Sequence, residues 1–358
     1  MNPLNPAQVN ELLRGARANA VIYLIGAGGC GMSGLGHLLV DLGFRVVGSD
    51  LAANEEIRQL RLRGAEIQTG HDPAQILAAQ PVLVVYTSAV RRDNPELQTA
   101  ERLRLPIVRR AVLLAALLQR QNGICVAGMH GKTTTSAWLA FALEQLGARL
   151  SYAIGALVPQ LVPHARLGAG PAATAPNAQP CFVVEADESD GTLCEFNPEH
   201  AIVLNVDAEH LDYYANVEAV GREFQQFARQ TRGHLIFCAD DARLTELFSR
   251  RPGAISFGFH PLAAYRIESR PPGSSVAPHP SADADPAARA SHVSRFTFHE
   301  SRFAIWHAGQ LLGEFTTHLL GEKNLSNAAA VIALLHQLGF APEAIARAVA
   351  PFRGAERR

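Results

Sequence analysis

The sequence predicts an α/β protein with two domains, each built on a parallel sheet. The chain has 358 residues, and at roughly 150 residues per domain this length gives two or three domains. Short apolar runs of strand length alternate with stretches of helical periodicity, as they do in a parallel sheet with crossover helices. Two glycine-rich segments, at 26–31 and 128–134, each follow a predicted strand and open a predicted helix.

The composition is that of a chain with sizeable buried cores. Hydrophobic residues make up 48% and charged residues 18%, unlike a disordered chain. Lys and Arg total 32 against 33 Asp and Glu, so the formal net charge of -1 creates no basic field for nucleic acid or anionic lipid. No stretch approaches the ~18 apolar residues of a membrane span, and the N-terminal segment lacks the apolar region of a signal peptide. We therefore expect a cytoplasmic protein with neither nucleic acid nor membrane as a partner.

The cysteines fit reduced structural thiols better than a zinc site or a disulfide framework. They are odd in number, far apart and free of any C-x-x-C pair. The five are Cys30, Cys125, Cys181, Cys194 and Cys238.

The first domain is predicted at residues 1–106. A strand at 21–25, a helix through 35–42 and a strand at 44–47 form a βαβ unit. The pattern continues with a helix near 55–63, a short strand at 66–67 and an apolar strand at 82–86.

The second domain is predicted at residues 107–358. A helix at 111–119 leads to a strand at 123–127 and an Ala/Leu-rich helix at 134–146. The later expected elements are strands at 181–184, 201–206 and 234–238, β-structure at 295–315, and helices at 327–338 and 343–349. Two segments, 168–180 and 270–289, are predicted to be loops without chemistry of their own.

The first glycine-rich segment, GAGGCG at 26–31, matches G-x-G-x-x-G between a strand and a helix. Asp50 ends the next predicted strand, 19 residues beyond Gly31. Glycines let backbone N–H groups approach a diphosphate at a helix N-terminus, and an acidic side chain accepts a hydrogen bond from the nucleoside. Taken alone the motif indicates a dinucleotide, but a UDP-sugar satisfies the same physics and a pure packing role stays open.

The second segment, GMHGKTT at 128–134, ends in the G-K-T of a P-loop. Val126 stands where the strict pattern has its outer glycine, yet the loop still follows a strand and opens a helix. Lys132 is one of only two lysines in the chain and would reach the terminal phosphates, while the Thr133 hydroxyl would ligate Mg²⁺. The predicted fold class is therefore α/β, with an N-terminal Rossmann-like parallel-sheet domain followed by a P-loop-type ATP-binding α/β central domain.

Acidic residues follow two predicted strands of the second domain. EADESD at 185–190 comes after one strand, and NVDAEHLD at 205–212, which includes His210, comes after another. Open α/β sheets bind ligands at the carboxyl ends of their strands, and hard oxygen ligands beside a P-loop suit Mg²⁺. The alternatives are a solvated acidic turn and, for His210 taken alone, a structural histidine; beside the P-loop we favour the role of ligand.

With these motifs the sequence resembles the Mur ligases, ATP-dependent amide-forming enzymes of peptidoglycan synthesis. The matching segments occur in the family's order across nearly the whole chain: GAGGCGMSG (26–34), GSD (48–50), TSAVRRDNPEL (87–97), GMHGKTTT (128–135), HARLG (164–168), EADESDGT (185–192), NVDAEHLDYY (205–214), GEKNLSN (321–327) and FRGAERR (352–358). The resemblance is greatest to the branch that joins L-alanine to UDP-N-acetylmuramate.

This resemblance implies a reaction, its substrates and its cofactors. ATP would phosphorylate the muramate carboxylate with the help of Mg²⁺, and the amine of L-alanine would attack the acyl phosphate. Lys132, Glu185 and His210 would be the catalytic residues.

The resemblance also assigns residues to three sites. The UDP-sugar would lie against Gly28, Gly29, Gly31, Ser33, Asp50, His71, Ser88 and Arg109. ATP would lie against Gly128, Met129, His130, Gly131, Lys132, Thr133, Thr134, Asn324 and Asn327. The metal ligands would be Thr133, Glu185 and His210.

The chain departs from the family pattern at a few positions. Met129 replaces a usual threonine, Val112 a common glutamate and Lys323 a histidine. The sequence also ends where the family's C-terminal, amino-acid-binding domain is expected, so a separate C-terminal domain is a further candidate partner. These departures leave open a degenerate or truncated module that binds UDP-sugar and ATP without forming the amide. A related ligase that adds a whole peptide, and an NAD-dependent oxidoreductase, also stay open.

Overall fold

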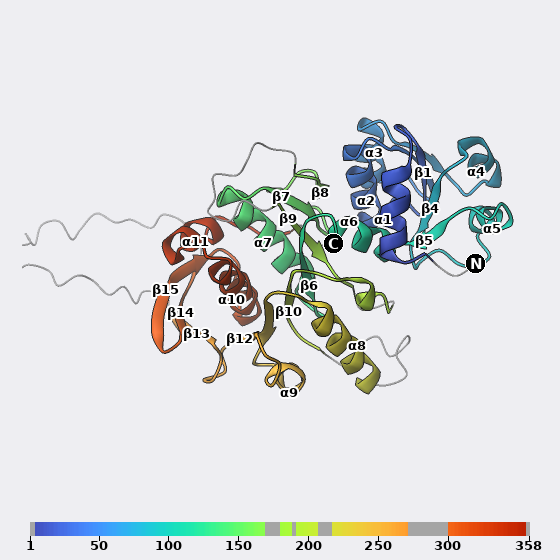
Figure 1. Cartoon of the computed structure of the whole chain (residues 1–358). Coiled ribbons are helices and arrows are strands. Elements are labelled where there is room, and N and C mark those ends of the chain that lie inside the picture. The colour runs from blue at the N-terminus through green and yellow to red at the C-terminus, as the bar shows by residue number, and fades with distance from the viewer. Residues whose placement is uncertain (1–3, 169–179, 188–190, 207–216, 271–299, 356–358) are drawn as a thin grey trace, which may run out of the picture.

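The computed structural model describes residues 4–168, 180–187, 191–206, 217–270 and 300–355. Two β-sheets of unequal size organise it, and Figure 1 shows each as a separate lobe. We call residues 4–118 the first lobe and residues 119–355 the second lobe. The predicted α/β fold class is confirmed.

The first lobe contains five parallel strands in the order β3-β2-β1-β4-β5, the order of a Rossmann fold. The strands are β1 (Val21–Ile25), β2 (Arg45–Asp50), β3 (Glu66–Thr69), β4 (Leu83–Tyr86) and β5 (Ile107–Arg109). The helices are α1 (Pro6–Gly15), α2 (Cys30–Asp41), α3 (Glu55–Leu62), α4 (Pro73–Ala79), α5 (Pro95–Arg102) and α6 (Arg110–Leu118).

Short polar side chains begin most helices of this lobe. Asn5 and Gln8 form a capping box at α1, where each side chain accepts a hydrogen bond from the other residue's backbone N–H. Asn54, Asp72 and Asn94 accept hydrogen bonds from the first free N–H groups of α3, α4 and α5. Helix α2 is different, because Gly29 precedes it and no side chain caps it.

The second lobe contains a ten-stranded mixed sheet in the order β15-β14-β13-β12-β11-β10-β6-β9-β7-β8. Its strands are β6 (Asn122–Ala127), β7 (Leu150–Ala153), β8 (Ala165–Arg166), β9 (Cys181–Glu185), β10 (His200–Val203), β11 (Leu235–Cys238), β12 (Ala254–Gly258), β13 (Tyr265–Arg270), β14 (Ser301–His307) and β15 (Gln310–Thr317). Its helices are α7 (Lys132–Gln145), the 3₁₀ helix η1 (Leu193–Glu195), α8 (Val217–Gln230), α9 (Ala242–Phe248), α10 (Glu322–Gln337) and α11 (Pro342–Val349).

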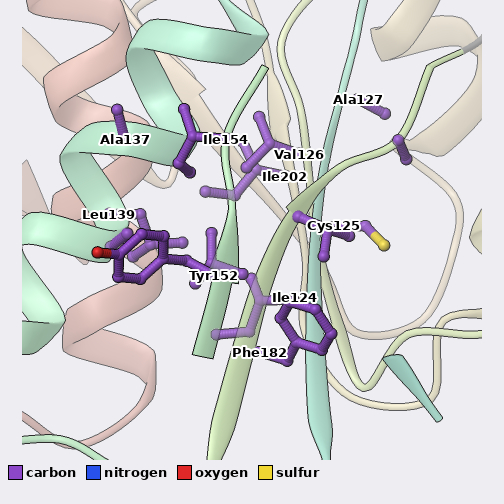
Figure 2. Packing of buried hydrophobic residues seen from close by; sticks show 14 of the residues in the cluster. Ile124, Cys125, Val126, Ala127, Ala137, Leu139, Tyr152, Ile154, Phe182 and Ile202 are labelled. Carbon is purple, nitrogen blue, oxygen red and sulfur yellow. The ribbon is translucent and has the colours of Figure 1, made fainter. Parts of the chain in front are cut away.

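The core of the second lobe lies between the central strands and the Ala/Leu-rich face of α7. Figure 2 shows Ile124, Val126 and Ile202 on the strands beside Ala137 and Leu139 of the helix. Trp138 is fully buried on the same helix. Its indole N–H donates to the carbonyl of Val349 at 2.9 Å, and its ring stacks on Phe352. These contacts tie the C-terminal helix to the phosphate-loop helix.

The structure has a helix or strand at each predicted element and adds others, from the two-residue strand β8 to the 14-residue helix α8. The added elements are α1, α4, α5, β5, β7, β8, η1, α8, α9, β12 and β13, and the predicted strand at 201–206 ends at Val203. The first sheet extends to Arg109, beyond the predicted boundary at 106, so the exact domain division stays a prediction. The antiparallel hairpin of β14 and β15 accounts for the β-structure expected up to 315, whereas residues 295–299 lie outside the described residues. No disulfide joins the five cysteines.

Candidate active site

The first glycine loop is fastened to the carboxyl end of β2. The N–H groups of Gly26 and Ala27 donate to the carbonyl of Ser49 at 2.9 and 3.0 Å. The N–H of Gly28 donates to Oδ2 of Asp50 at 2.8 Å. A Cβ on Gly28 would lie 3.0 Å from the same carboxylate oxygen, so a larger residue would disturb this contact. The loop thus leads into the uncapped N-terminus of α2, where backbone N–H groups favour an anion.

The other residues predicted for the UDP-sugar surround this loop at different depths. Ser33 is buried in the first turn of α2, and His71 lies just after β3 with its side chain 14% exposed. Ser88 is exposed on the loop after β4. Arg109 ends β5 and acts electrostatically on Glu195 of the second lobe: burial raises the pKa of Glu195, and the charge of Arg109 offsets part of that rise.

The phosphate loop after β6 has the backbone that its glycines allow. Gly128 and Gly131 have φ values of +126° and +87°, in the left-handed region that favours glycine. A Cβ on Gly128 would lie 3.0 Å from the backbone N and O of Asn205. Asn205 binds the loop through its side chain: Oδ1 accepts from the N–H of His130 at 2.8 Å, and Nδ2 donates to its carbonyl at 2.9 Å.

Lys132 extends along the phosphate loop. Its Nζ donates to the carbonyl of Gly128 at 2.8 Å and lies 3.9 Å from Oδ1 of Asp187. The side chain is only 15% exposed. The one ammonium group of this loop therefore lies against the backbone that would surround the terminal phosphates.

Glu185 is surrounded by hydrogen-bond donors. Its Oε2 accepts from Oγ1 of Thr133 at 3.1 Å, and its Oε1 accepts from Oγ of Ser136 at 3.1 Å and from the N–H of Gly155 at 2.6 Å. Burial raises the pKa of Glu185, while these hydrogen bonds and the charge of Lys132 lower it. The site therefore disfavours a bare carboxylate and gains from a bound cation.

The oxygen atoms of Thr133 and Glu185 fit a magnesium site. Both are hard ligands of the kind that Mg²⁺ prefers, and the structure brings them within hydrogen-bond distance. His210, the third predicted ligand, lies outside the described residues. In the described part of the chain, no group of three His, Cys, Asp or Glu side chains is placed to hold a metal.

The two predicted asparagines lie at the start of α10. Oδ1 of Asn327 would be 2.9 Å from a Cβ on Gly131, so Asn327 borders the phosphate loop. Asn324 instead donates from Nδ2 to the carbonyl of Leu320 at 2.8 Å. Of the other residues predicted for ATP, His130 is exposed, Met129 is buried and Thr134 is half-buried on the first turn of α7.

A small cavity lies between the two lobes. Gly31 and Gly34 line it from the first lobe, and Gly155 and Glu185 line it from the second. Arg110 lies between them, with a guanidinium nitrogen 3.0 Å from a Cβ position on Gly31. Another of its guanidinium nitrogens lies 3.8 Å from Oδ2 of Asp187, so Arg110 bridges the lobes electrostatically.

Two family models match the chain and identify its protein family. A model of the Mur ligase family catalytic domain matches residues 21–122, and a model of the Mur ligase middle domain matches residues 126–335. The chain belongs to the Mur ligase family.

Relatives of this Mur ligase are similar over almost its entire length. A UDP-N-acetylmuramate–L-alanine ligase from a Bradyrhizobium species is 36% identical over 343 residues, which cover 94% of this chain and 67% of the relative. The ligase of the same name from a Synechococcus species is 38% identical, and the matched region covers 94% of this chain and 63% of the relative. The chain thus spans about two thirds of the length of these relatives.

Two solved ligases share the fold of both lobes. A UDP-N-acetylmuramate–alanine ligase from Thermotoga maritima has a TM-score of 0.76 at 29% identity, covering 94% of this chain and 69% of that chain. A UDP-N-acetylmuramate:L-alanyl-γ-D-glutamyl-meso-diaminopimelate ligase from Neisseria meningitides has a TM-score of 0.79 at 26% identity, covering 95% and 100%. The oxidoreductase interpretation of the first glycine loop finds no support among these relatives. Across the described ranges, no helix combines the length and apolarity needed to cross a membrane.

Sequence reasoning missed four polar residues of this site. Asn205 and Asp187 stand in segments that the family resemblance had marked, but their contacts to the phosphate loop and Lys132 need the fold. Ser136 lies one helical turn after Thr133, and this spacing could have indicated a second hydroxyl beside Glu185. Arg110 follows β5 directly, and no local pattern distinguishes it.

Proposed function

We propose that the chain belongs to an ATP-dependent ligase of cell-wall synthesis that joins L-alanine to UDP-N-acetylmuramate. The cavity lined by Gly31 and Glu185 carries this proposal, because it brings the anion-binding end of α2 together with the carboxylate beside the phosphate loop. The relatives that bear the name of this activity support the choice of substrates.

The reaction has two steps that conserve atoms and charge. An oxygen of the muramate carboxylate attacks the γ-phosphorus of ATP, the bond to ADP breaks, and an acyl phosphate forms. The amine of L-alanine then attacks the acyl carbon, loses a proton and expels inorganic phosphate as the amide forms. Two anions must meet in the first step, so positive charge around the transferred group is the main requirement.

Residues of the second lobe would supply this positive charge. The ammonium group of Lys132 would give up its hydrogen bond to the carbonyl of Gly128 and bind the terminal phosphates instead. Thr133 and Glu185, with His210, would hold Mg²⁺, which when bound supplies further positive charge beside the phosphates. Gly128, Met129, His130, Gly131 and Thr134 would surround ATP, with Asn324 and Asn327 on the opposite side.

The residues of the first lobe would hold the UDP-sugar. Gly28, Gly29, Gly31 and Ser33 would face the diphosphate, and Asp50 and His71 the uridine. Ser88 and Arg109 would lie near the sugar. We accordingly assign the UDP-sugar to residues 1–106 and ATP with Mg²⁺ to residues 107–358, and we place the reaction in the cytoplasm.

The decisive experiment measures phosphate release by this chain with ATP, Mg²⁺, UDP-N-acetylmuramate and L-alanine, each also omitted in turn. We expect release that requires all four, together with calorimetric binding of UDP-N-acetylmuramate but not of NAD. Replacing L-alanine with the tripeptide L-alanyl-γ-D-glutamyl-meso-diaminopimelate tests the activity named for the Neisseria protein. Binding of both nucleotides without turnover would instead favour a module that needs a separate C-terminal domain.

A further inference from the structure

Glu96 is a carboxylate buried without exposure in the first lobe, in the first turn of α5. Its two oxygens have different partners. Oε1 accepts from the hydroxyl of Tyr23 at 2.7 Å and from the N–H of Asp72 at 3.1 Å. Oε2 lies 2.5 Å from Oγ of Ser49 and 3.0 Å from Nδ1 of His71. The side chains of Ser49 and His71 therefore share one carboxylate oxygen of Glu96.

These contacts determine where the hydrogen atoms lie. Ser49 has one hydroxyl hydrogen, and its Oγ is close to both Oε2 of Glu96 and Nδ1 of His71, at 2.5 and 2.9 Å. Oε2 of the carboxylate has no hydrogen to donate, so the Ser49 hydroxyl donates to Glu96. Oγ of Ser49 and Oε2 of Glu96, the two atoms that face Nδ1 of His71, are then both acceptors. Nδ1 must therefore carry the ring hydrogen.

The same network is continuous with the first glycine loop. Ser49 accepts the N–H groups of Gly26 and Ala27 on its backbone carbonyl while its side chain contacts His71. His71 follows β3, at the end of the sheet where the loop lies. Within the described residues, Nε2 of His71 has no hydrogen-bond partner, and the ring is partly exposed. A nucleoside diphosphate bound at α2 and extended across β2 toward β3 would meet this nitrogen.

We propose that Glu96 is a positioning residue for the nucleobase. Through Oε2 it holds His71 in the tautomer with hydrogen on Nδ1, so that Nε2 presents a lone pair to the N3–H of uracil. This inference rests on the proposed binding of a UDP-sugar in the first lobe.

The arrangement selects between the two pyrimidine bases. Uracil carries a hydrogen on N3 and donates it to the lone pair of Nε2. Cytosine has a lone pair at N3, so the two nitrogens would face each other without a hydrogen between them. Mismatched polar groups in a binding site cost roughly tenfold or more in affinity, and we expect UDP to bind more tightly than CDP by at least this factor.

The substitution Glu96→Gln reverses the polarity of the network with little change in shape. The amide oxygen would keep the Oε1 position, where Tyr23 and Asp72 donate. The NH₂ group would occupy the Oε2 position and donate to Nδ1, which moves the ring hydrogen of His71 to Nε2. We expect UDP to bind less tightly and CDP more tightly, so that the ratio of their dissociation constants falls by roughly tenfold.

Tyr23→Phe is the matched control. It removes a donor from Oε1 of the same carboxylate and leaves the contact of Oε2 with His71. Calorimetry with UDP and CDP should give the wild-type ratio for this variant. If both variants change the ratio equally, the effect comes from packing around Glu96 and the proposal is overturned.

Nitrogen NMR of the His71 ring in the wild-type protein gives a readout that does not depend on any variant folding. At about pH 8, where a histidine is ordinarily neutral, we expect the wild-type ring to carry its hydrogen on Nδ1 and the Glu96→Gln ring on Nε2. Hydrogen on Nε2 in the wild type would overturn the inference. Failure of the proposed function is distinct, because then UDP-N-acetylmuramate and UDP would not bind the wild type at all.

Discussion

Ser33 and His164 join the two lobes beside the first glycine loop. Oγ of Ser33 lies 3.2 Å from Nε2 of His164, and the same nitrogen lies 3.0 Å from the carbonyl oxygen of Cys30. Ser33 is fully buried and His164 is 3% exposed. Gly34 completes the contact, since a Cβ there would lie 3.3 Å from the Cβ of Ala165. The start of α2, where we place the diphosphate, is thus packed against β8 of the other lobe.

His164→Ala should loosen this contact. The substitution removes a buried ring and its hydrogen bonds to Ser33 and Cys30, so we expect the free energy of unfolding to fall by about 2 kcal/mol. Urea denaturation measures the change. Leu262→Ala, at a side chain 85% exposed, should alter stability by less than about 0.5 kcal/mol. Equal stability of the two variants would show that the lobes do not depend on this contact.

Lys132→Ala should abolish ATP-dependent chemistry while leaving UDP-N-acetylmuramate binding nearly intact. The ammonium group belongs to the phosphate loop, and the UDP-sugar is assigned to the other lobe. We expect phosphate release to fall by roughly 100-fold or more. Arg347→Ala removes an exposed cation from α11 and should leave turnover unchanged. Loss of UDP-sugar binding together with turnover would contradict the division of labour between the lobes.

Glu185→Gln should separate stability from activity. Burial raises the pKa of Glu185, so its charged form destabilises the protein when no cation is bound, and the amide removes this cost. We expect the variant without ligands to melt at or above the wild-type temperature and to lose the rise in Tm that Mg²⁺ with ATP gives the wild type. A variant that keeps this rise would argue against Glu185 as a metal ligand.

Acid should destabilise both lobes through two histidines, His37, which is buried, and His200, which is half-buried. Burial, with the charge of His164, lowers the pKa of His37 to about 4, and burial, with the charge of His234, does the same for His200. The unfolded chain takes up these protons near pH 6.5, before the folded protein does, so stability is present above about pH 6.5 and falls toward pH 4.

Urea denaturation across this range tests the acid effect. We expect each histidine to account for roughly 1 to 2 kcal/mol of lost stability between about pH 7 and pH 5. His37→Gln and His200→Gln should each flatten the pH dependence. A wild-type unfolding free energy that is constant over this interval would contradict the prediction.

Local sequence patterns predicted the parts of the site that are built locally. Both glycine loops, Lys132 and Glu185 stand where a strand runs into a turn, and such positions are visible in a short window of sequence. Several elements that escaped prediction are short, such as β8, which has two residues, whereas the 14-residue amphipathic helix α8 was simply overlooked. Such a strand exists because β7 offers it a partner, and a partner distant in sequence leaves no local signal.

The polar networks escaped prediction for the same reason. Glu96 lay in the segment 87–97 that the family resemblance marked, but the partners of its carboxylate come from positions 23, 49, 71 and 72, so the local sequence does not show what it contacts. His164 lay in a segment that the family resemblance marked, but only the packing of α2 on β8 shows what it contacts.

The burial of Trp138 has a practical consequence for following unfolding. The chain has two tryptophans, Trp138 on α7 and Trp306 on β14, and both belong to the second lobe. Trp138 is fully buried and stacked on Phe352, so its fluorescence should be blue-shifted in the native state and shift to the red when α7 and α11 separate. Tryptophan emission would then report on one lobe while circular dichroism reports on both, and transitions that fail to coincide would reveal lobes that unfold one after the other.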